Sequence, residues 1–316
     1  MFGVPACGGQ ATPRTIVQAE GADSGAAPSM PQAAISEPKT GDQIAAPIAI
    51  SPVAQIAQSI TDELSVAARQ ATATAATLEQ LRTAGQTDRA AASDFVRGIV
   101  ESSPDILGAS TVWQPDAYDG RDVDFAVVDL QNPDTGQFLV YWARGADGSI
   151  KQAKINHTKL VAKGSWLSPM TSGRPYVSEP YSFAIAGVSR ISATISVPIL
   201  DPTGVIPEPL GVYSIDIPLH SVEAGLQSES LPKDARVILV DRNNDLATDS
   251  DPAWQPGSGL AAPGEPFASY LIESRGDPTM DITIEWSRKI YRLAVAPVLF
   301  NGDQRIWRLM MLTPSK

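Results

Sequence analysis

Three aromatic side chains and one carboxylate stand out as groups that could hold a small cation. Trp142, Trp166 and Tyr181 offer ring faces, which attract ammonium groups through the ring quadrupole. Asp216 ends a largely apolar run that starts at Val212. A carboxylate in such a place is costly unless it is paired. Asp216 is therefore a candidate partner for a cation; the alternative interpretation is a helix cap or an internal salt bridge.

The chain has few of the residues that nucleophilic, redox or zinc chemistry would need. The chain has one cysteine, Cys7, and two histidines, His157 and His220. A single cysteine excludes an intramolecular disulfide and a cysteine-rich zinc site. The sequence has no Ser–His–Asp spacing, phosphate-binding loop or dinucleotide fingerprint. We therefore expect no enzyme activity, no metal and no cofactor.

Two acidic segments resemble calcium-binding loops. Asp119, Asp122 and Asp124 crowd one turn, for which calcium is one interpretation and an Asp-Gly turn the favoured one. The segment 241–245 starts like an EF-hand loop, but it has Leu246 at the required glycine and Pro252 at the closing glutamate. We interpret it as a hairpin turn.

Composition and charge narrow the class of protein. The 316 residues favour about two domains, and 43% hydrophobic with 19% charged residues is ordinary for a globular protein. No stretch of about 18 apolar residues occurs, so no segment is predicted to span a membrane. The net charge of −11 argues against a nucleic-acid partner, because an acidic surface repels phosphate backbones.

Residues 1–46 are predicted to form a disordered tether rich in alanine and proline. The segment has no Leu, Trp or Tyr, so it cannot bury enough apolar surface to offset its ordering entropy. Val4–Cys7 resembles the end of a bacterial lipobox, which would make Cys7 a lipidation site. Only six residues precede Cys7, which is too few for a signal sequence. The alternatives are a start codon assigned too late and a chance cysteine.

One long helix is expected within 47–87, over residues 47–84. Apolar residues recur there at steps of three and four, which places them on one helical face: Ile56, Ile60, Leu64, Ala67, Ala71, Ala75, Leu78 and Leu81. This stripe either packs on sheets of its own chain or forms a homodimer. Gly85 ends the run, and Asp88 is a candidate cap of a second helix.

The rest of the chain reads as two sets of short strands. Runs rich in β-branched and aromatic residues predict strands, and the segments are 106–113, 125–130, 138–142, 192–199 and 211–217, then 236–240, 281–286, 291–298 and 305–312. A short amphipathic segment, 220–231, separates the sets, and 151–189 is expected to be largely irregular. Strands at short spacing after a long helix favour an α+β fold with antiparallel sheets.

The segment 88–217 resembles the membrane-distal module of double-Cache sensor domains of bacterial chemoreceptors. The segments that match are 103–108, 113–122 and 135–144, then Trp166, 179–181, 198–199 and 211–217. With the long helix and the smaller strand set, the resemblance covers about 47–312. It implies a long helix beside two PAS-like modules: a ligand-binding module at 88–219 and a membrane-proximal one at 220–316.

The resemblance also implies where a ligand sits. In the amino-acid-binding branch of the family, an aspartate at the position of Asp216 holds the ligand's ammonium group. In that branch an arginine binds the ligand's carboxylate, and its position is occupied by Gly164 in this sequence. The adjacent Lys163 is expected to point elsewhere. Arg144 is a candidate substitute, the alternative being a solvated strand-end arginine; Arg190 is a weaker candidate. The predicted ligand-binding set is Tyr141, Trp142, Arg144, Trp166, Tyr181 and Asp216.

Two hypotheses of function follow from the resemblance. The first is an extracytoplasmic sensor module that binds a small, polar, amine-containing molecule for chemotaxis or signal transduction. The second is a stand-alone secreted or lipid-anchored protein that presents a ligand to a separate receptor. A chemoreceptor has a transmembrane helix on each side of this domain, and neither is found in this sequence. Membrane association would thus need either a lipid anchor or a transmembrane segment that this sequence does not include.

Overall fold

The computed structural model describes residues 51–126, 134–154, 163–185, 188–250, 267–276, 279–286 and 288–315. The chain divides into a short unit, Met1–Ile48, and a compact unit, Ala49–Lys316. The predicted tether and Cys7 lie outside the described residues. The module bounds 88–219 and 220–316 remain predictions; below, the first module means α2 to β7 and the second module means α6 to β12.

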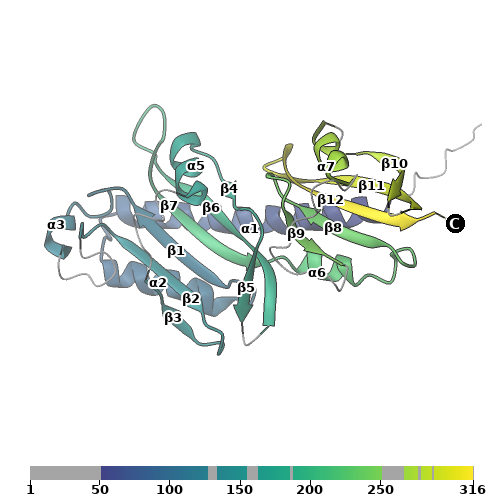
Figure 1. Cartoon of the computed structure of the whole chain (residues 1–316). Helices are drawn as coiled ribbons and strands as arrows, with labels where there is room; N and C mark the ends of the chain where they lie inside the picture. Colours follow the sequence, from purple (N-terminus) through teal and green to yellow (C-terminus); the bar gives the residue numbers. More distant parts are fainter. Residues whose placement is uncertain are drawn as a thin grey trace, which may run out of the picture. The chain divides into compact units, whose positions relative to one another are not determined.

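Helix α1 (Pro52–Thr83) is the long helix that the apolar stripe predicts (Figure 1). Ser51 caps it, since its side chain accepts from the Ala54 amide at 3.4 Å, and Gly85 beyond its end has φ +73°. The stripe from Ile56 to Leu78 is buried in a core that includes strands of both sheets. The stripe is thus used within the chain itself, and α1 contacts both sheets.

The first sheet is antiparallel and carries the candidate site. Its described order is β3-β2-β1-β7-β6-β4, with β5 also paired to β6. Helices α1 and α2 pack on one face of this sheet, whereas α5 contacts β4, β6 and β7 (Figure 1). The strands are β1 (Gly108–Trp113), β2 (Leu139–Arg144), β3 (Ile150–Gln152), β4 (Tyr176–Val177), β5 (Tyr181–Ile185), β6 (Val188–Asp201) and β7 (Glu208–Pro218).

The second sheet is antiparallel in the order β10-β11-β12-β8-β9 among the described strands. Its strands are β8 (Arg236–Val240), β9 (Leu246–Asp249), β10 (Asp281–Trp286), β11 (Lys289–Phe300) and β12 (Gln304–Pro314). The long helix and two antiparallel sheets confirm the predicted α+β fold class. The turn between β8 and β9 is the hairpin expected at 241–245, because Asp241 Oδ1 accepts from the amides of Asn243 and Asp245 at 2.7 and 2.8 Å.

The remaining helices are α2 (Arg89–Ser102), α3 (Asp122–Phe125), α5 (Gly164–Ser172), α6 (His220–Leu226) and α7 (Phe267–Gly276). Asp88 caps α2 as predicted and accepts from the Ala91 amide at 2.7 Å. Two local expectations are wrong. Phe125 ends helix α3 instead of opening a strand, and the segment expected to be irregular contains α5 and strands β3 to β5.

The two modules meet at Glu179, which lies between β4 and β5. Its Oε1 pairs with the Arg242 guanidinium, and its Oε2 accepts from Trp307 Nε1 at 3.1 Å. Arg242 also donates to the carbonyl of Val177 at 2.8 Å. A single carboxylate of the first module thus joins two residues of the second.

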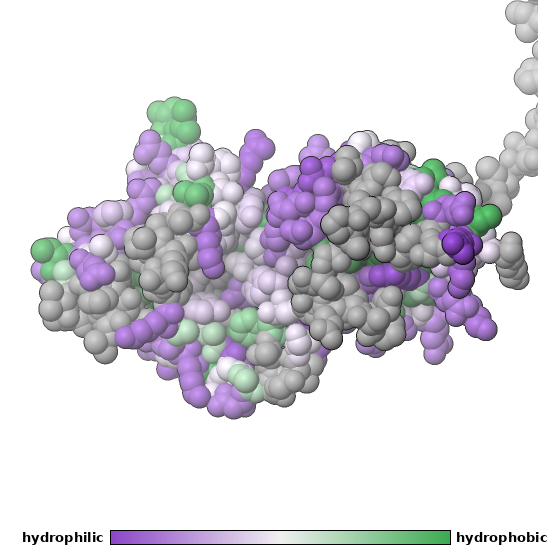
Figure 2. All heavy atoms as spheres, viewed as in Figure 1, coloured by the Kyte–Doolittle hydropathy of each residue, from purple (hydrophilic) through white to green (hydrophobic). Residues whose placement is uncertain are grey.

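The surface drawn in Figure 2 shows apolar side chains in separate patches among polar ones. Val205 and Ile206 at the tip of the β6–β7 hairpin are among the exposed large apolar residues. Among the described residues, no helix is both long and apolar enough to cross a membrane.

Candidate functional site

A cavity of about 380 Å³ lies on the face of the first sheet that α5 covers. Its lining comes from strands β1, β2, β5, β6 and β7, from the start of α5 with the residue before it, and from the link between β4 and β5. The lining residues are Ser110, Tyr141, Lys163, Ser165, Ser178, Tyr181, Phe183, Thr194, Ser214 and Asp216. Most of these side chains carry a hydroxyl group. The cavity is therefore polar, with one carboxylate and one ammonium group among the described lining residues.

The alternation of side chains in the strands explains this polar floor. In β7, Tyr213, Ile215 and Ile217 are buried in the core, whereas Ser214 and Asp216 line the cavity. Successive residues of a strand point to opposite faces of the sheet. The apolar half of the pattern thus packs on the helices, and the polar half faces the cavity.

Asp216 is held by three neutral hydroxyl groups. Tyr141 donates to Oδ2 at 2.8 Å, while Tyr181 and Thr194 donate to Oδ1 at 2.9 and 2.6 Å. Asp216 is partly buried as a residue and lines the cavity. Among the described residues, no cation lies within ion-pairing distance of it. The internal salt bridge and the helix cap, the alternatives for Asp216, are thus not what the structure shows.

Burial raises the pKa of Asp216, although the three hydroxyl donors and the positive charge of Lys163 oppose the rise. Burial, followed by the charge of Asp216, also raises the pKa values of Tyr141 and Tyr181. Both phenols therefore stay protonated and act as hydrogen-bond donors at neutral pH. The result is a carboxylate whose described hydrogen-bond partners are all neutral.

Glycine at position 108 makes room for this hydrogen bonding. Gly108 faces Asp216 in the β1–β7 ladder. A Cβ atom at Gly108 would lie 2.7 Å from the Tyr141 hydroxyl and 2.9 Å from Asp216 Oδ2. Contacts this short do not occur for real side chains, so a larger residue would displace the Tyr141–Asp216 pair.

Three of the six predicted site residues converge on the cavity: Tyr141, Tyr181 and Asp216. Trp166 lies in α5 beside the lining residue Ser165 but is not among the lining residues. Lys163, which precedes Gly164, does line the cavity, so the expectation that Lys163 points elsewhere is wrong.

The placement of Trp142 and Arg144 at the cavity is wrong, because both face the opposite side of β2 from Tyr141. Trp142 Nε1 donates to Ser93 Oγ of α2 at 3.0 Å. Arg144 Nη2 donates to the carbonyls of Val100 and Ser103 at 2.7 and 3.1 Å. Arg144 thus satisfies carbonyl groups at the end of α2.

The family's clamp position and the weaker arginine candidate have structural roles. A Cβ atom at Gly164 would lie 2.8 Å from the Tyr176 hydroxyl, so an arginine there would clash with Tyr176. Arg190 is paired with Glu223 of α6 at 2.6 Å. Neither position provides a carboxylate clamp in the cavity.

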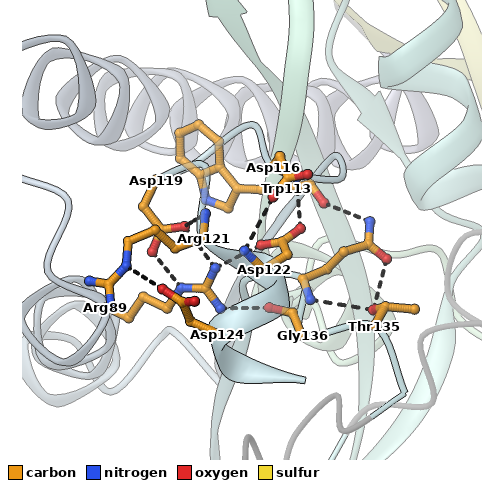
Figure 3. Close-up of polar contacts among 10 residues, drawn as sticks. Arg89, Trp113, Asp116, Asp119, Arg121, Asp122, Asp124, Thr135 and Gly136 are labelled. Atoms are coloured by element: carbon orange, nitrogen blue, oxygen red, sulfur yellow. Dashed lines mark hydrogen bonds and ion pairs between the residues drawn. The ribbon is translucent and has the colours of Figure 1, made fainter. Parts of the chain in front are cut away.

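The acidic turn is an ion-pair network centred on Arg89 (Figure 3). Arg89 Nε donates to Asp119 at 2.7 Å, and its Nη2 donates to Asp122 at 2.7 Å. Asp122 also accepts from the amide of Asp116. These carboxylates therefore tie the turn to α2. Across the described residues, no group of three or more His, Cys, Asp and Glu side chains is arranged to hold a metal ion.

Sequence reasoning missed the hydroxyl residues of the cavity, notably Ser110, Thr194 and Ser214, and also Phe183. The available signal is the period-two alternation of small hydroxyl residues with apolar residues in β6 and β7. That pattern distinguishes a strand with a polar inner face from one that is buried on both faces.

Comparison with known proteins gives one related sequence and several related structures. No protein-family model matches the sequence. The methyl-accepting chemotaxis protein TlpQ of Pseudomonas aeruginosa is 30% identical over 142 residues, which are 41% of this chain and 19% of TlpQ. The match thus spans about a fifth of the chemoreceptor's length.

The structural neighbours come from histidine kinases and chemoreceptors. An extracellular domain named as that of a histidine kinase, mmHK1S-Z2, has a TM-score of 0.66 at 18% identity, over 83% of this chain and 94% of that one. Methyl-accepting chemotaxis protein X has a TM-score of 0.61 at 20% identity, over 83% and 93%. The periplasmic sensory domain of chemoreceptor Tlp1 of Campylobacter jejuni has a TM-score of 0.57 at 12% identity, over 83% and 91%.

Proposed function

We propose that this chain, which has the double-Cache fold of extracytoplasmic sensor domains, is a ligand-binding sensor module that recognises a small polar amine outside the cytoplasm. The fold supports a sensor role rather than catalysis. The single observation that carries the amine is Asp216, a carboxylate on the cavity floor that is bonded only to neutral donors in the described residues.

The electrostatics of Asp216 favour a cationic ligand. A buried charge is costly when neutral groups are its only partners. An ammonium group would compensate the charge and add a charge-assisted hydrogen bond, which contributes about 1.5–3 kcal/mol. The phenol rings of Tyr141 and Tyr181 flank the same carboxylate and add faces that attract a cation.

The remaining lining residues limit what else the ligand carries. Lys163 is a donor for an acceptor atom on the same molecule, and Ser110 and Ser214 provide hydroxyl groups that both donate and accept. Phe183 supplies an apolar surface. The ligand that fits has an amine near Asp216 and an oxygen acceptor near Lys163; a carboxylate is allowed but not required.

A thermal-shift screen tests the proposal. The panel contains primary amines, amino acids, purines and organic acids, each measured on the wild type and on Asp216→Asn. A ligand at 100 times its Kd stabilises the native state by about 2.7 kcal/mol. We expect an amine to raise the melting temperature of the wild type and not that of Asp216→Asn. The proposal fails if no amine gives a shift that this substitution abolishes.

A further inference from the structure

A second cavity, of about 290 Å³, lies in the second module, where it is lined by the turn after β8, the end of α7 and the start of β12. Figure 1 labels these three elements. Its lining is rich in arginine and includes Asp241, Arg242, Arg275, Arg305, Trp307 and Arg308. Nothing in the proposed amine site accounts for this cavity, because the two share no lining residue.

The charge around the second cavity is the reverse of the charge of the chain. The whole sequence has 24 basic and 35 acidic residues, yet four of the basic ones line this one cavity. Asp241 is the single carboxylate in the described lining, and its Oδ1 already accepts from the amides of Asn243 and Asp245. Arg242 is paired with Glu179, yet the described lining still carries more positive than negative charge once this pair and Asp241 are counted.

Two of the arginines converge on one neutral oxygen. Arg275 Nε and Arg308 Nη2 both donate to Asn244 Oδ1, at 3.0 and 2.6 Å. Burial and then the charge of Arg275 lower the pKa of Arg308, while the charge of Asp241 opposes this change, and Arg308 is only 6% exposed. Arg275 Nη2 donates to the Arg242 carbonyl at 2.7 Å. Like charges are thus held together around an uncharged acceptor, an arrangement that an anion would stabilise.

The cavity also offers donors that are not used inside the protein. Arg305 lies at the exposed start of β12, and its side chain forms no hydrogen bond or ion pair with any described residue. Arg275 uses Nε and Nη2, which leaves Nη1 for another acceptor. A guanidinium presents planar, paired donors that match a carboxylate or phosphate group.

We propose that this cavity of the second module binds a small multivalent oxyanion, either phosphate or a di- or tricarboxylate. Arg275 and Arg305 contribute the donors to the ligand, and the buried Arg308 contributes a fixed positive charge behind them. The cavity volume suits a small molecule. This second site takes a ligand of opposite charge to the amine proposed for the first.

Isothermal titration calorimetry on the full chain, with inorganic phosphate and with citrate at constant ionic strength, tests the proposal. We expect Arg305→Ala and Arg275→Ala each to weaken binding of the better anion by about tenfold or more. Arg305→Ala keeps the experiment decisive if Arg275→Ala fails to fold, because the exposed Arg305 side chain bonds to no described residue.

The matched control is Arg292→Ala, which removes an exposed arginine of the same module that pairs with Asp281. Its Kd should stay within about twofold of the wild type, and so should that of Asp216→Asn, which separates this site from the amine site. The proposal is overturned if neither anion binds below roughly 10 mM, if Arg305→Ala binds like the wild type, or if Arg292→Ala weakens binding as much as Arg305→Ala.

Discussion

Gly108 and Asp216 face each other across the β1–β7 ladder, and the missing side chain of Gly108 leaves the space in which Tyr141 reaches the Asp216 carboxylate. The hydroxyl of Tyr141 and Oδ2 of Asp216 are 2.8 Å apart. A backbone position thus sets the geometry of the candidate site as directly as the side chains that line it.

Gly108→Ala should impair the site while leaving the fold in place. The added methyl group would push Tyr141 away from Asp216, so amine binding should weaken by about tenfold, measured by calorimetry. The matched control is Gly98→Ala in α2, where a Cβ atom meets nothing within 4 Å; it should stabilise the chain by about 0.5–1 kcal/mol. Equal affinity in both variants would refute this role of Gly108.

Amine binding should weaken as the pH falls through the raised pKa of Asp216, because the ammonium group needs the ionised carboxylate. Between the ordinary carboxyl pKa and this raised one, the folded chain holds a proton that the unfolded chain has lost. The free energy of unfolding of the ligand-free chain should therefore fall as the pH rises over that interval. Urea unfolding and binding titrations from about pH 4 to 8 measure both effects, and Asp216→Asn should show neither. An identical pH profile in that variant would assign the titration to another group.

Arg144→Ala should destabilise the chain without affecting the ligand. Its guanidinium donates to the carbonyls of Val100 and Ser103 at the end of α2, so the loss should cost about 1–3 kcal/mol in urea unfolding. Lys151→Ala, which removes an exposed ion pair with Asp147, is the control and should cost less than about 1 kcal/mol. A large loss of amine affinity in Arg144→Ala at an unchanged melting temperature would place Arg144 in the ligand site after all.

Arg89→Met should be strongly destabilising, by about 3 kcal/mol, because it leaves the carboxylates of Asp119 and Asp122 without their cation. The ion pair holds the pKa of Asp119 below its ordinary value. Its contribution is therefore present above the ordinary carboxyl pKa and is lost as the pH falls through the lowered one. Arg121→Met removes an exposed pair with Asp124 and should cost less than about 1 kcal/mol. Similar losses in the two variants would show that the Arg89 network is not structural.

The long helix and both strand sets could be predicted from the sequence because burial of one face requires apolar residues at regular spacing. Such patterns are the stripe from Ile56 to Leu78 and the apolar runs that form β6 to β8 and β10 to β12. Helix α5 was missed because its nine residues contain Ser, Gly and an internal Pro169, so they carry almost no helical signal.

The sequence predicts a site residue correctly only when two conditions hold. Its side chain must have suitable chemistry, and its position in the strand must place that side chain on the cavity face of the sheet. Asp216, Tyr141 and Tyr181 meet across strands that are far apart in sequence; the resemblance implied a ligand role for Asp216, and the aromatic ring made Tyr181 a candidate. Trp142 and Arg144 were misplaced because a shift of one position along β2 reverses the face of the sheet. The arginine cavity of the second module has no sequence signal, since the turn after β8, α7 and β12 meet only in the folded chain.

The most direct test of the amine assignment is a calorimetric titration of the strongest-binding amine from the screen into the wild type, Asp216→Asn and the control Asp147→Asn, which removes an exposed carboxylate of the same module. We predict that Asp216→Asn weakens binding by about tenfold or more, while Asp147→Asn stays within about twofold of the wild type. If Asp216→Asn binds the amine within about twofold of the wild type, the carboxylate on the cavity floor is not what recognises the ligand.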